Sequence, residues 1–192
     1  MIDVKLVVQV KLLPTPEQAS ALESTLRACT TAASDVAVVA RETGVYRNYD
    51  LRKHVYQPIK DDYRLGAQVA QHVIKKTCDA YKTLTANIKA GRYGKAGSKR
   101  RGTVEANPIG FRWDAAQPYD ARMLSWQSHA RTVSVWTVAG RLKAVAYTGS
   151  PDQLTAVAEL PVGECDLVHR DGMWFLYATR SRRTRTGRSA WR

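Results

Sequence analysis

The chain has 192 residues, which is enough for one domain or two small ones with a buried core. Its 30 lysines and arginines exceed its 17 aspartates and glutamates. The resulting formal charge of +13 is typical of proteins that bind a polyanion, although a ribosome-like or merely soluble basic protein has the same composition. No apolar run of about 18 residues occurs, so we expect no membrane partner.

The N-terminal sequence MIDVKLVVQVKLL has charged residues among its apolar ones and no cleavage site after it, so it is not a signal peptide. Cys29, Cys78 and Cys165 are widely spaced and form no CxxC pair, which argues against a zinc ribbon. Scattered cysteines of this kind are typical of reduced, buried thiols in a cytoplasmic protein.

Residues 2–12 alternate between apolar and polar side chains and predict a strand with one buried face. That face carries Ile2, Val4, Leu6, Val8 and Val10. A helix follows over Pro16–Thr43, because Thr15 can cap it and Gln18 completes a capping box. Gly44 is a plausible stop for this helix.

A shorter helix is predicted over Leu51–Tyr63, which Pro58 should kink or divide. The next helix, Gly66–Ala90, has apolar residues at helical spacing on one face. Its other face carries Gln68, Gln71, Lys75, Lys76 and Lys82. This face is either an ordinary solvated surface or one that offers amides and ammonium groups to a nucleic acid.

The segment GRYGKAGSKRRG, residues 91–102, is basic and rich in glycine. It cannot bury itself, and we therefore expect residues 91–111 to form a flexible linker. Its cations are Arg92, Lys95, Lys99, Arg100 and Arg101. They either keep the linker solvated or contact nucleic acid.

From residue 112 the pattern changes to short strands rich in valine, tryptophan and tyrosine. We expect strands at Ala121–Trp126, Thr132–Val138, Arg141–Tyr147, Glu164–Val168 and Met173–Ala178, and a short helix at Pro151–Glu159. Ala139-Gly140 and Asp171-Gly172 predict hairpin turns. The arginine-rich residues 180–192 have almost no apolar content, and we expect them to be disordered.

Helices followed by a run of strands predict an α+β fold rather than a wound parallel sheet. The simplest arrangement is a small β-barrel with a helical block inserted after its first strand. The expected regions are residues 1–13 for the first strand, 14–90 for the helical block, 91–111 for the linker, 112–179 for the rest of the barrel, and 180–192 for the tail.

No catalytic, metal or cofactor site is predicted. The acids are scattered, whereas metal-dependent nucleases need several carboxylates that converge on a divalent ion. The sequence has no GxSxG, P-loop, GxGxxG or HExxH motif. Each of the four histidines lacks a partner motif.

Five pieces of the chain, taken together, resemble the N-terminal part of TnpB/OrfB, the transposon-encoded RNA-guided nucleases related to type V CRISPR effectors. The pieces are KLLPTPEQASALESTLRAC, YRLGAQVAQHVIKKTCDAYK, YDARMLSW, TVSVWTVAGRLKAVAY and GECDLVHRDGMWFLYAT, in this order. The resemblance covers about residues 5–179, and none of the pieces is a catalytic motif.

The resemblance implies a wedge-type barrel with an inserted helical recognition block, which together hold a guide RNA and read a short DNA motif beside the target. In that family a RuvC-like domain with a zinc ribbon cuts the DNA. Its D-x-G motif should follow Ala178, where this sequence instead has TRSRRTRTGRSAWR. We therefore expect a truncated or frame-shifted, nuclease-deficient relative, with any nuclease half supplied separately.

The resemblance carries over binding roles only. They fall on Lys11 and Thr15, on the helix face with Gln68, Gln71, Lys75 and Lys76, and on the linker cations Arg92, Lys95, Lys99, Arg100 and Arg101. The alternatives are a general RNA-binding or ribosome-associated protein, and a nuclease with an unrecognised active site. The sequence does not identify the RNA or the DNA motif.

Overall fold

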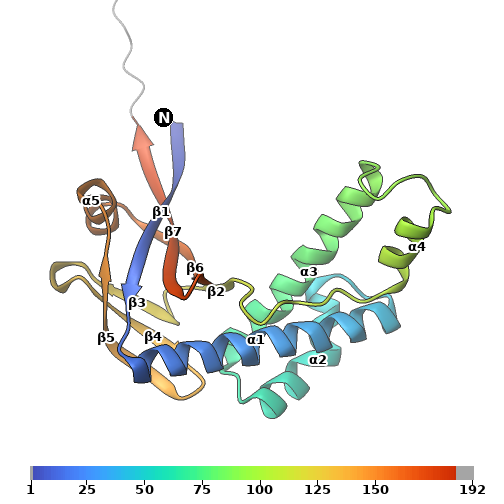
Figure 1. The fold of residues 1–192 in the computed structure, drawn as a ribbon, viewed down its shortest axis with the longest axis horizontal. Helices are drawn as coiled ribbons and strands as arrows, with labels where there is room; N and C mark the ends of the chain where they lie inside the picture. The colour runs from blue at the N-terminus through green and yellow to red at the C-terminus, as the bar shows by residue number, and fades with distance from the viewer. Residues whose placement is uncertain (1, 185–192) are drawn as a thin grey trace, which may run out of the picture. The chain divides into compact units, whose positions relative to one another are not determined.

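A computed structural model describes residues 2–184, apart from the side chains of residues 2–4, 162 and 182–184. The helices are α1 (Pro16–Thr43), α2 (Asn48–Tyr63), α3 (Ala67–Lys89), α4 (Lys99–Ala106) and α5 (Pro151–Glu159), with a short 3-10 helix η1 (Ser128–Ala130). The strands are β1 (Ile2–Leu13), β2 (Gln117–Tyr119), β3 (Leu124–Gln127), β4 (Thr132–Thr137), β5 (Gly140–Thr148), β6 (Val162–Arg170) and β7 (Met173–Thr184) (Figure 1).

The chain folds into two compact units. The helical unit contains Ala21–Gln117 together with Thr137–Ala139, and the sheet unit contains the remaining described residues. The helical unit is therefore an insertion, since chain segments on both sides of it build the sheet unit. This arrangement agrees with the predicted helical block after the first strand.

The sheet unit has seven strands in the order β2-β6-β7-β1-β5-β4-β3, and they form a nearly closed, barrel-like antiparallel sheet. Strand β1 pairs with β7 from Ile2↔Thr184 to Leu12↔Trp174. On its other side, β1 pairs with β5 from Lys11↔Thr148 to Leu13↔Ala146. The α+β class, the barrel and the pairing of the first strand with later strands are thus confirmed.

The buried face of β1 carries Val8, Val10 and Leu12. These alternate as the sequence predicts, because successive side chains of a strand point to opposite faces. Leu6 departs from the prediction of a buried face, since it is 37% exposed. It lines an open hollow beside α5 instead of the core.

Strands β6 and β7 meet at the predicted Asp171-Gly172 turn, where both residues have positive φ angles of 50° and 72°. This is the backbone conformation of a two-residue hairpin turn with φ > 0 at both central positions. The expectation of a disordered tail from residue 180 is wrong for 180–184. Strand β7 continues to Thr184, because the long β1 offers backbone partners up to that point. Residues 185–192 lie outside the described part of the chain.

Arg180 is the largest fully buried side chain of the sheet unit, at 1% exposure. Its Nη1 donates a hydrogen bond to the Leu160 carbonyl at 2.9 Å, and its guanidinium lies 5.0 Å from the centre of the Trp126 ring. Burial lowers the pKa of Arg180. Because Leu160 caps the C-terminal end of α5, this arginine places a cation where the helix dipole is negative. A residue predicted to belong to a solvated tail thus belongs to the interior.

The core of the helical unit lies between α1, α2 and α3. Small buried residues on α1, including Ala33 and Ala37, allow α3 to approach closely. From α3, the Thr77 hydroxyl donates to the Ala33 carbonyl at 3.2 Å, and the Tyr81 hydroxyl donates to the Ala37 carbonyl at 2.8 Å. These bonds satisfy polar groups that burial would otherwise leave unpaired. The two hydrogen bonds also determine which face of α3 packs against α1.

Two helices differ from the sequence prediction; among the strands, β3 begins at Leu124 rather than at the predicted Ala121, and β2 was not predicted. Helix α2 begins earlier, at Asn48, and Pro58 does not divide it. The exposed Pro58 lies between buried Val55 and Ile59, whose packing holds both halves of the helix. The predicted linker contains a helix, α4, because Ser98 caps it by accepting a hydrogen bond from the Arg101 amide at 3.4 Å.

All three cysteines are free and buried, as predicted. Burial raises the pKa of the Cys29 thiol to about 12 and that of Cys165 to about 11, and it also raises the pKa of Cys78. Since the thiolate is the reactive form, the native protein should resist alkylation at neutral pH. Mass spectrometry after iodoacetamide treatment should show unmodified native protein and three adducts after denaturation. Fast native labelling of any cysteine would contradict its buried position.

Deletion of residues 2–12 should disrupt the sheet unit more than the helical unit, because it removes the strand that pairs with both β5 and β7. Hydrogen–deuterium exchange followed by mass spectrometry should show fast exchange in β5 and β7 but continued protection in α2 and α3. Loss of protection confined to the helices would contradict the role of β1.

Candidate nucleic-acid interface

The predicted polar face of α3 lies on the outside of the helical unit. Gln68 and Gln71 are partly exposed and Lys75 is exposed. The Gln68 side-chain nitrogen lies 3.3 Å from Nε2 of buried His72, and Lys75 forms an ion pair with Asp79 at 3.5 Å. The structure therefore brings these three side chains onto one accessible surface. Gln71 can donate and accept hydrogen bonds there, as reading a base edge requires.

Lys76 has a different environment from its neighbour Lys75. Its ammonium group donates to the Ala115 carbonyl at 3.2 Å and lies 5.2 Å from the centre of the Phe111 ring. Both partners belong to the segment that leaves the helical unit after α4. Lys76 thus holds that segment against α3, a role that sequence spacing alone does not reveal.

Lys11 and Thr15 lie in the sheet unit, whereas the other predicted binding residues lie in the helical unit. The Thr15 hydroxyl and the Gln18 side chain form the predicted capping box of α1. The Gln18 amide donates to Oγ1 of Thr15 at 3.3 Å, and the Thr15 amide donates to Oε1 of Gln18 at 3.0 Å. Lys11 is partly exposed on β1. The geometry accounts for Thr15 as a helix cap, and Lys11 stays a predicted phosphate contact.

The basic segment places exposed Arg92 and Lys95 in the turns before α4. Lys99, Arg100 and Arg101 then form the first turn of that helix, which contains no acid. Cations at a helix N-terminus are unfavourable by roughly 0.3–1 kcal/mol each, since that end of the helix carries positive potential. An anionic ligand would relieve this repulsion. Only Arg101 has a carboxylate close by, Glu105 at 2.8 Å, among the described pairs of this turn.

Helix α2 carries a surface row that the sequence reasoning missed. Tyr49 is 74% exposed, and the Lys53 ammonium lies 4.5 Å from its ring centre. Two turns beyond Tyr49, the ring centre of Tyr56 lies 5.7 Å from the Arg52 guanidinium and 5.4 Å from the Lys60 ammonium. We call these five residues the α2 row. Their spacing of three and four residues was visible in the sequence, but the predicted helix began at Leu51 and so left Tyr49 outside it.

The α2 row has the chemistry of a single-strand binding surface. Aromatic rings that stack with bases, next to cations that contact phosphates, are the common elements of such surfaces. A tyrosine as exposed as Tyr49 contributes little to the core of its own unit. Its position therefore fits a contact with a partner better than a role in folding.

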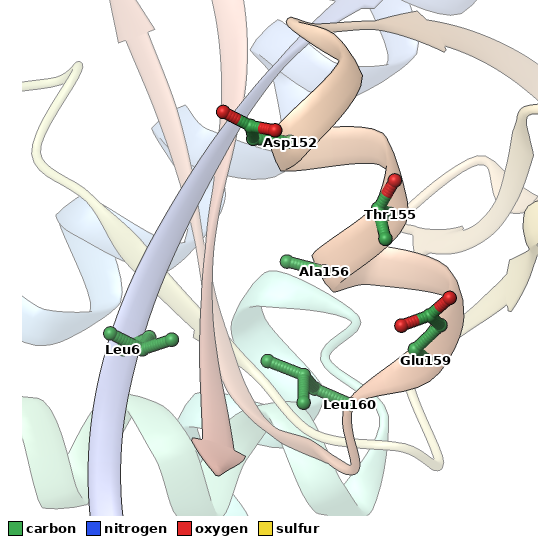
Figure 2. A pocket seen from close by; sticks show the side chains of 6 residues that line it. All are labelled: Leu6, Asp152, Thr155, Ala156, Glu159 and Leu160. Carbon is green, nitrogen blue, oxygen red and sulfur yellow. The ribbon is translucent and has the colours of Figure 1, made fainter.

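An open hollow in the sheet unit has the opposite charge. Figure 2 shows it between β1, which carries Leu6, and α5, which ends before Leu160. The hollow measures about 390 Å³, and Asp152 and Glu159 contribute carboxylates from the two ends of α5. Because carboxylates repel phosphates, this hollow does not suit a nucleic acid.

Within residues 2–184, no group of three or more histidines, cysteines, aspartates or glutamates is arranged to hold a metal ion. No helix in this part of the chain is long and apolar enough to cross a membrane. Comparison with protein-family models and with curated proteins finds no match for the chain. The assignment of a function therefore depends on the surfaces described above.

Replacing Lys76 by alanine should destabilise the helical unit, because it removes a charged hydrogen bond worth about 1.5–3 kcal/mol together with the contact to Phe111. Replacing Lys75 removes the same charge from an exposed ion pair worth about 0–1 kcal/mol. Chemical denaturation of K76A and K75A should thus show a clear loss of unfolding free energy in K76A only. Equal stability of the two variants would exclude the structural role of Lys76.

Proposed function

We propose that this chain binds nucleic acid as a relative of the TnpB/OrfB proteins, with the helical unit making most of the contacts. In this proposal the chain holds a guide RNA derived from a transposon end and reads a short DNA motif beside the target. The described residues bind and position nucleic acid, and no cutting step is assigned to them.

The order of the elements supports the proposed kinship. The resemblance to TnpB/OrfB implies one barrel strand, an inserted helical block and then the remaining barrel strands. The fold has this order, with β1 paired to β5 and β7 across the insertion. An insertion between paired strands is not required by the chemistry of nucleic-acid binding, so the agreement is independent of the charge argument.

The α2 row is the observation that carries the binding proposal. Net charge alone fits many basic proteins, but an exposed tyrosine with a lysine 4.5 Å from its ring centre does not follow from solubility. The first turn of α4 adds Lys99, Arg100 and Arg101, whose clustering an anion would stabilise. The two features favour a ligand that has both aromatic bases and phosphates.

The polar face of α3 has a separate part in the proposal. The amide of Gln71 is suited to base edges in a duplex groove, while exposed Lys75 is suited to phosphates. Lys76 is left out of this contact set because Ala115 and Phe111 already engage it. The proposal thus separates motif reading on α3 from single-strand contacts on α2.

Replacing Tyr49 by alanine should weaken binding of single-stranded RNA about 5- to 150-fold, since stacking of one base contributes roughly 1–3 kcal/mol. Tyr49→Phe is the matched control, because it keeps the ring and removes only the hydroxyl group. It should bind within about twofold of wild type. Fluorescence anisotropy with a labelled oligouridylate measures both affinities.

Because Tyr49 is exposed, its replacement should leave the protein folded, so that a change in affinity reports on binding. Substitutions at exposed positions usually change stability by less than about 0.5 kcal/mol. Equal affinities of Tyr49→Ala and wild type would remove the α2 row from the interface. Failure of the wild-type chain to bind RNA or DNA at low salt would contradict the proposed function as a whole.

A further inference from the structure

A second hollow lies in the helical unit, at the C-terminal half of α3, and has a volume of about 300 Å³. This is at the lower end of the roughly 300–1,000 Å³ of pockets that hold small organic ligands. Its lining residues are Tyr46, Tyr81, Lys82, Thr85, Ala86 and Lys89, which include two aromatic rings, two lysines and no carboxylate. It differs in charge from the acidic hollow beside α5. We call it the tyrosine pocket.

Tyr46 forms a preorganised wall of the tyrosine pocket. Its ring centre lies 4.7 Å from that of Tyr81, which is only 4% exposed. Arg41 on α1 donates a hydrogen bond from Nη1 to the Tyr46 hydroxyl at 3.3 Å. The second terminal nitrogen of the same guanidinium, Nη2, donates to the Asn107 carbonyl at 3.2 Å. Tyr46 is therefore held in place while part of its surface stays accessible.

The two lysines supply positive charge at this pocket. Lys82 and Lys89 are exposed and seven residues apart on α3, which is two turns and about 10.5 Å along the helix axis. Lys82 forms an ion pair with Asp79 at 3.0 Å, but pairs this exposed contribute only about 0–1 kcal/mol and yield readily to another anion. Two exposed cations that line an aromatic pocket match a base with a phosphate on each side.

We propose that the tyrosine pocket takes the base of one unpaired nucleotide. The base packs against Tyr46, and the phosphates on its two sides contact Lys82 and Lys89. This inference rests on the proposed nucleic-acid function and names a ligand subsite within it. A paired base cannot enter, because its faces are covered by its neighbours in the helix, so the pocket selects single strands or flipped-out bases.

The pocket shares Lys82 with the polar face of α3 but is otherwise distinct from the surfaces already assigned. The α2 row and Gln71 contribute no lining residue to it. Glu105 lines an adjoining hollow of about 100 Å³ and is engaged by Arg101 at 2.8 Å. The electrostatic repulsion of a phosphate at Lys82 and Lys89 by that carboxylate is therefore reduced.

Two variants test the inference. Tyr46→Leu keeps an apolar wall but removes the ring, and should weaken binding of oligouridylate about 5- to 150-fold. The double variant Lys82→Ala/Lys89→Ala leaves the packing untouched, and should lower the slope of log affinity against log salt by about 1.4, which corresponds to two phosphate contacts of a single strand. The matched control is Lys5→Ala/Lys143→Ala, which removes two exposed lysines from the sheet unit.

Affinities are measured by fluorescence anisotropy for oligouridylate, oligodeoxythymidylate and a blunt DNA duplex. The expected result is a loss in both variants for a single strand, with the duplex unaffected by Tyr46→Leu. The strand with the larger loss identifies RNA or DNA as the ligand. If Tyr46→Leu does not fold, as judged by circular dichroism, the double lysine variant decides.

The inference is overturned if folded Tyr46→Leu binds oligouridylate and oligodeoxythymidylate as wild type does, or if the double lysine variant behaves as its control does. Either result would reject the pocket as a base-binding site without contradicting nucleic-acid binding by the wild-type chain. Absence of wild-type binding to all three probes would instead contradict the proposed function itself.

Discussion

The backbone pairing of strand β1 with β5 on one side and β7 on the other determines how this chain is organised. β1 stands at one end of the described sequence, and its partners follow the whole helical unit. A strand with an apolar face cannot be stable alone, so the sheet cannot close until the C-terminal strands are present. The helical unit, in contrast, gets its core from contiguous helices and needs no such closure. The two units should therefore differ in how they respond to loss of the N-terminus.

Two groups among the described cations of this basic chain have different surroundings. Arg180, Arg41 and Lys76 donate hydrogen bonds to backbone carbonyls and lie near aromatic rings, so they stabilise the fold. The second group is exposed and borders tyrosines or the first turn of α4. Composition counts both groups equally, although only the second can neutralise phosphates. From a chain with a net charge of +13, the structure therefore singles out the exposed cations of α2, of α3, of the segment before α4 and of the first turn of α4 as candidate phosphate contacts.

Much of the fold could be predicted from local patterns, because alternation, helical spacing and turn residues report on local structure. The capping box at Thr15, the stop at Gly44 and the Asp171-Gly172 hairpin are examples. The failures came from tertiary context. The arginine-rich composition around Arg180 suggests a solvated segment. Strand β7 nevertheless continues through Arg180, because it pairs with β1, and the Arg180 guanidinium packs against the Trp126 ring. Pro58 breaks helices in isolation, yet the buried neighbours on both sides of it keep α2 whole.

The candidate site was less predictable than the fold. The sequence indicated the polar face of α3 and the basic segment, but it treated Lys75 and Lys76 alike, and only the structure separates them. The α2 row and the tyrosine pocket were not predicted. Both depend on which face of a helix stays exposed, and that is decided by packing against other helices.

The salt dependence of binding tests the central claim most directly. The affinity of the wild-type chain for single-stranded RNA should fall linearly in log units between about 50 and 200 mM salt, with a slope of roughly −0.7 for each phosphate neutralised. The predicted slope is several times this value, because several phosphates are neutralised. An affinity that stays flat across this range, or no binding even at low salt, would contradict the account.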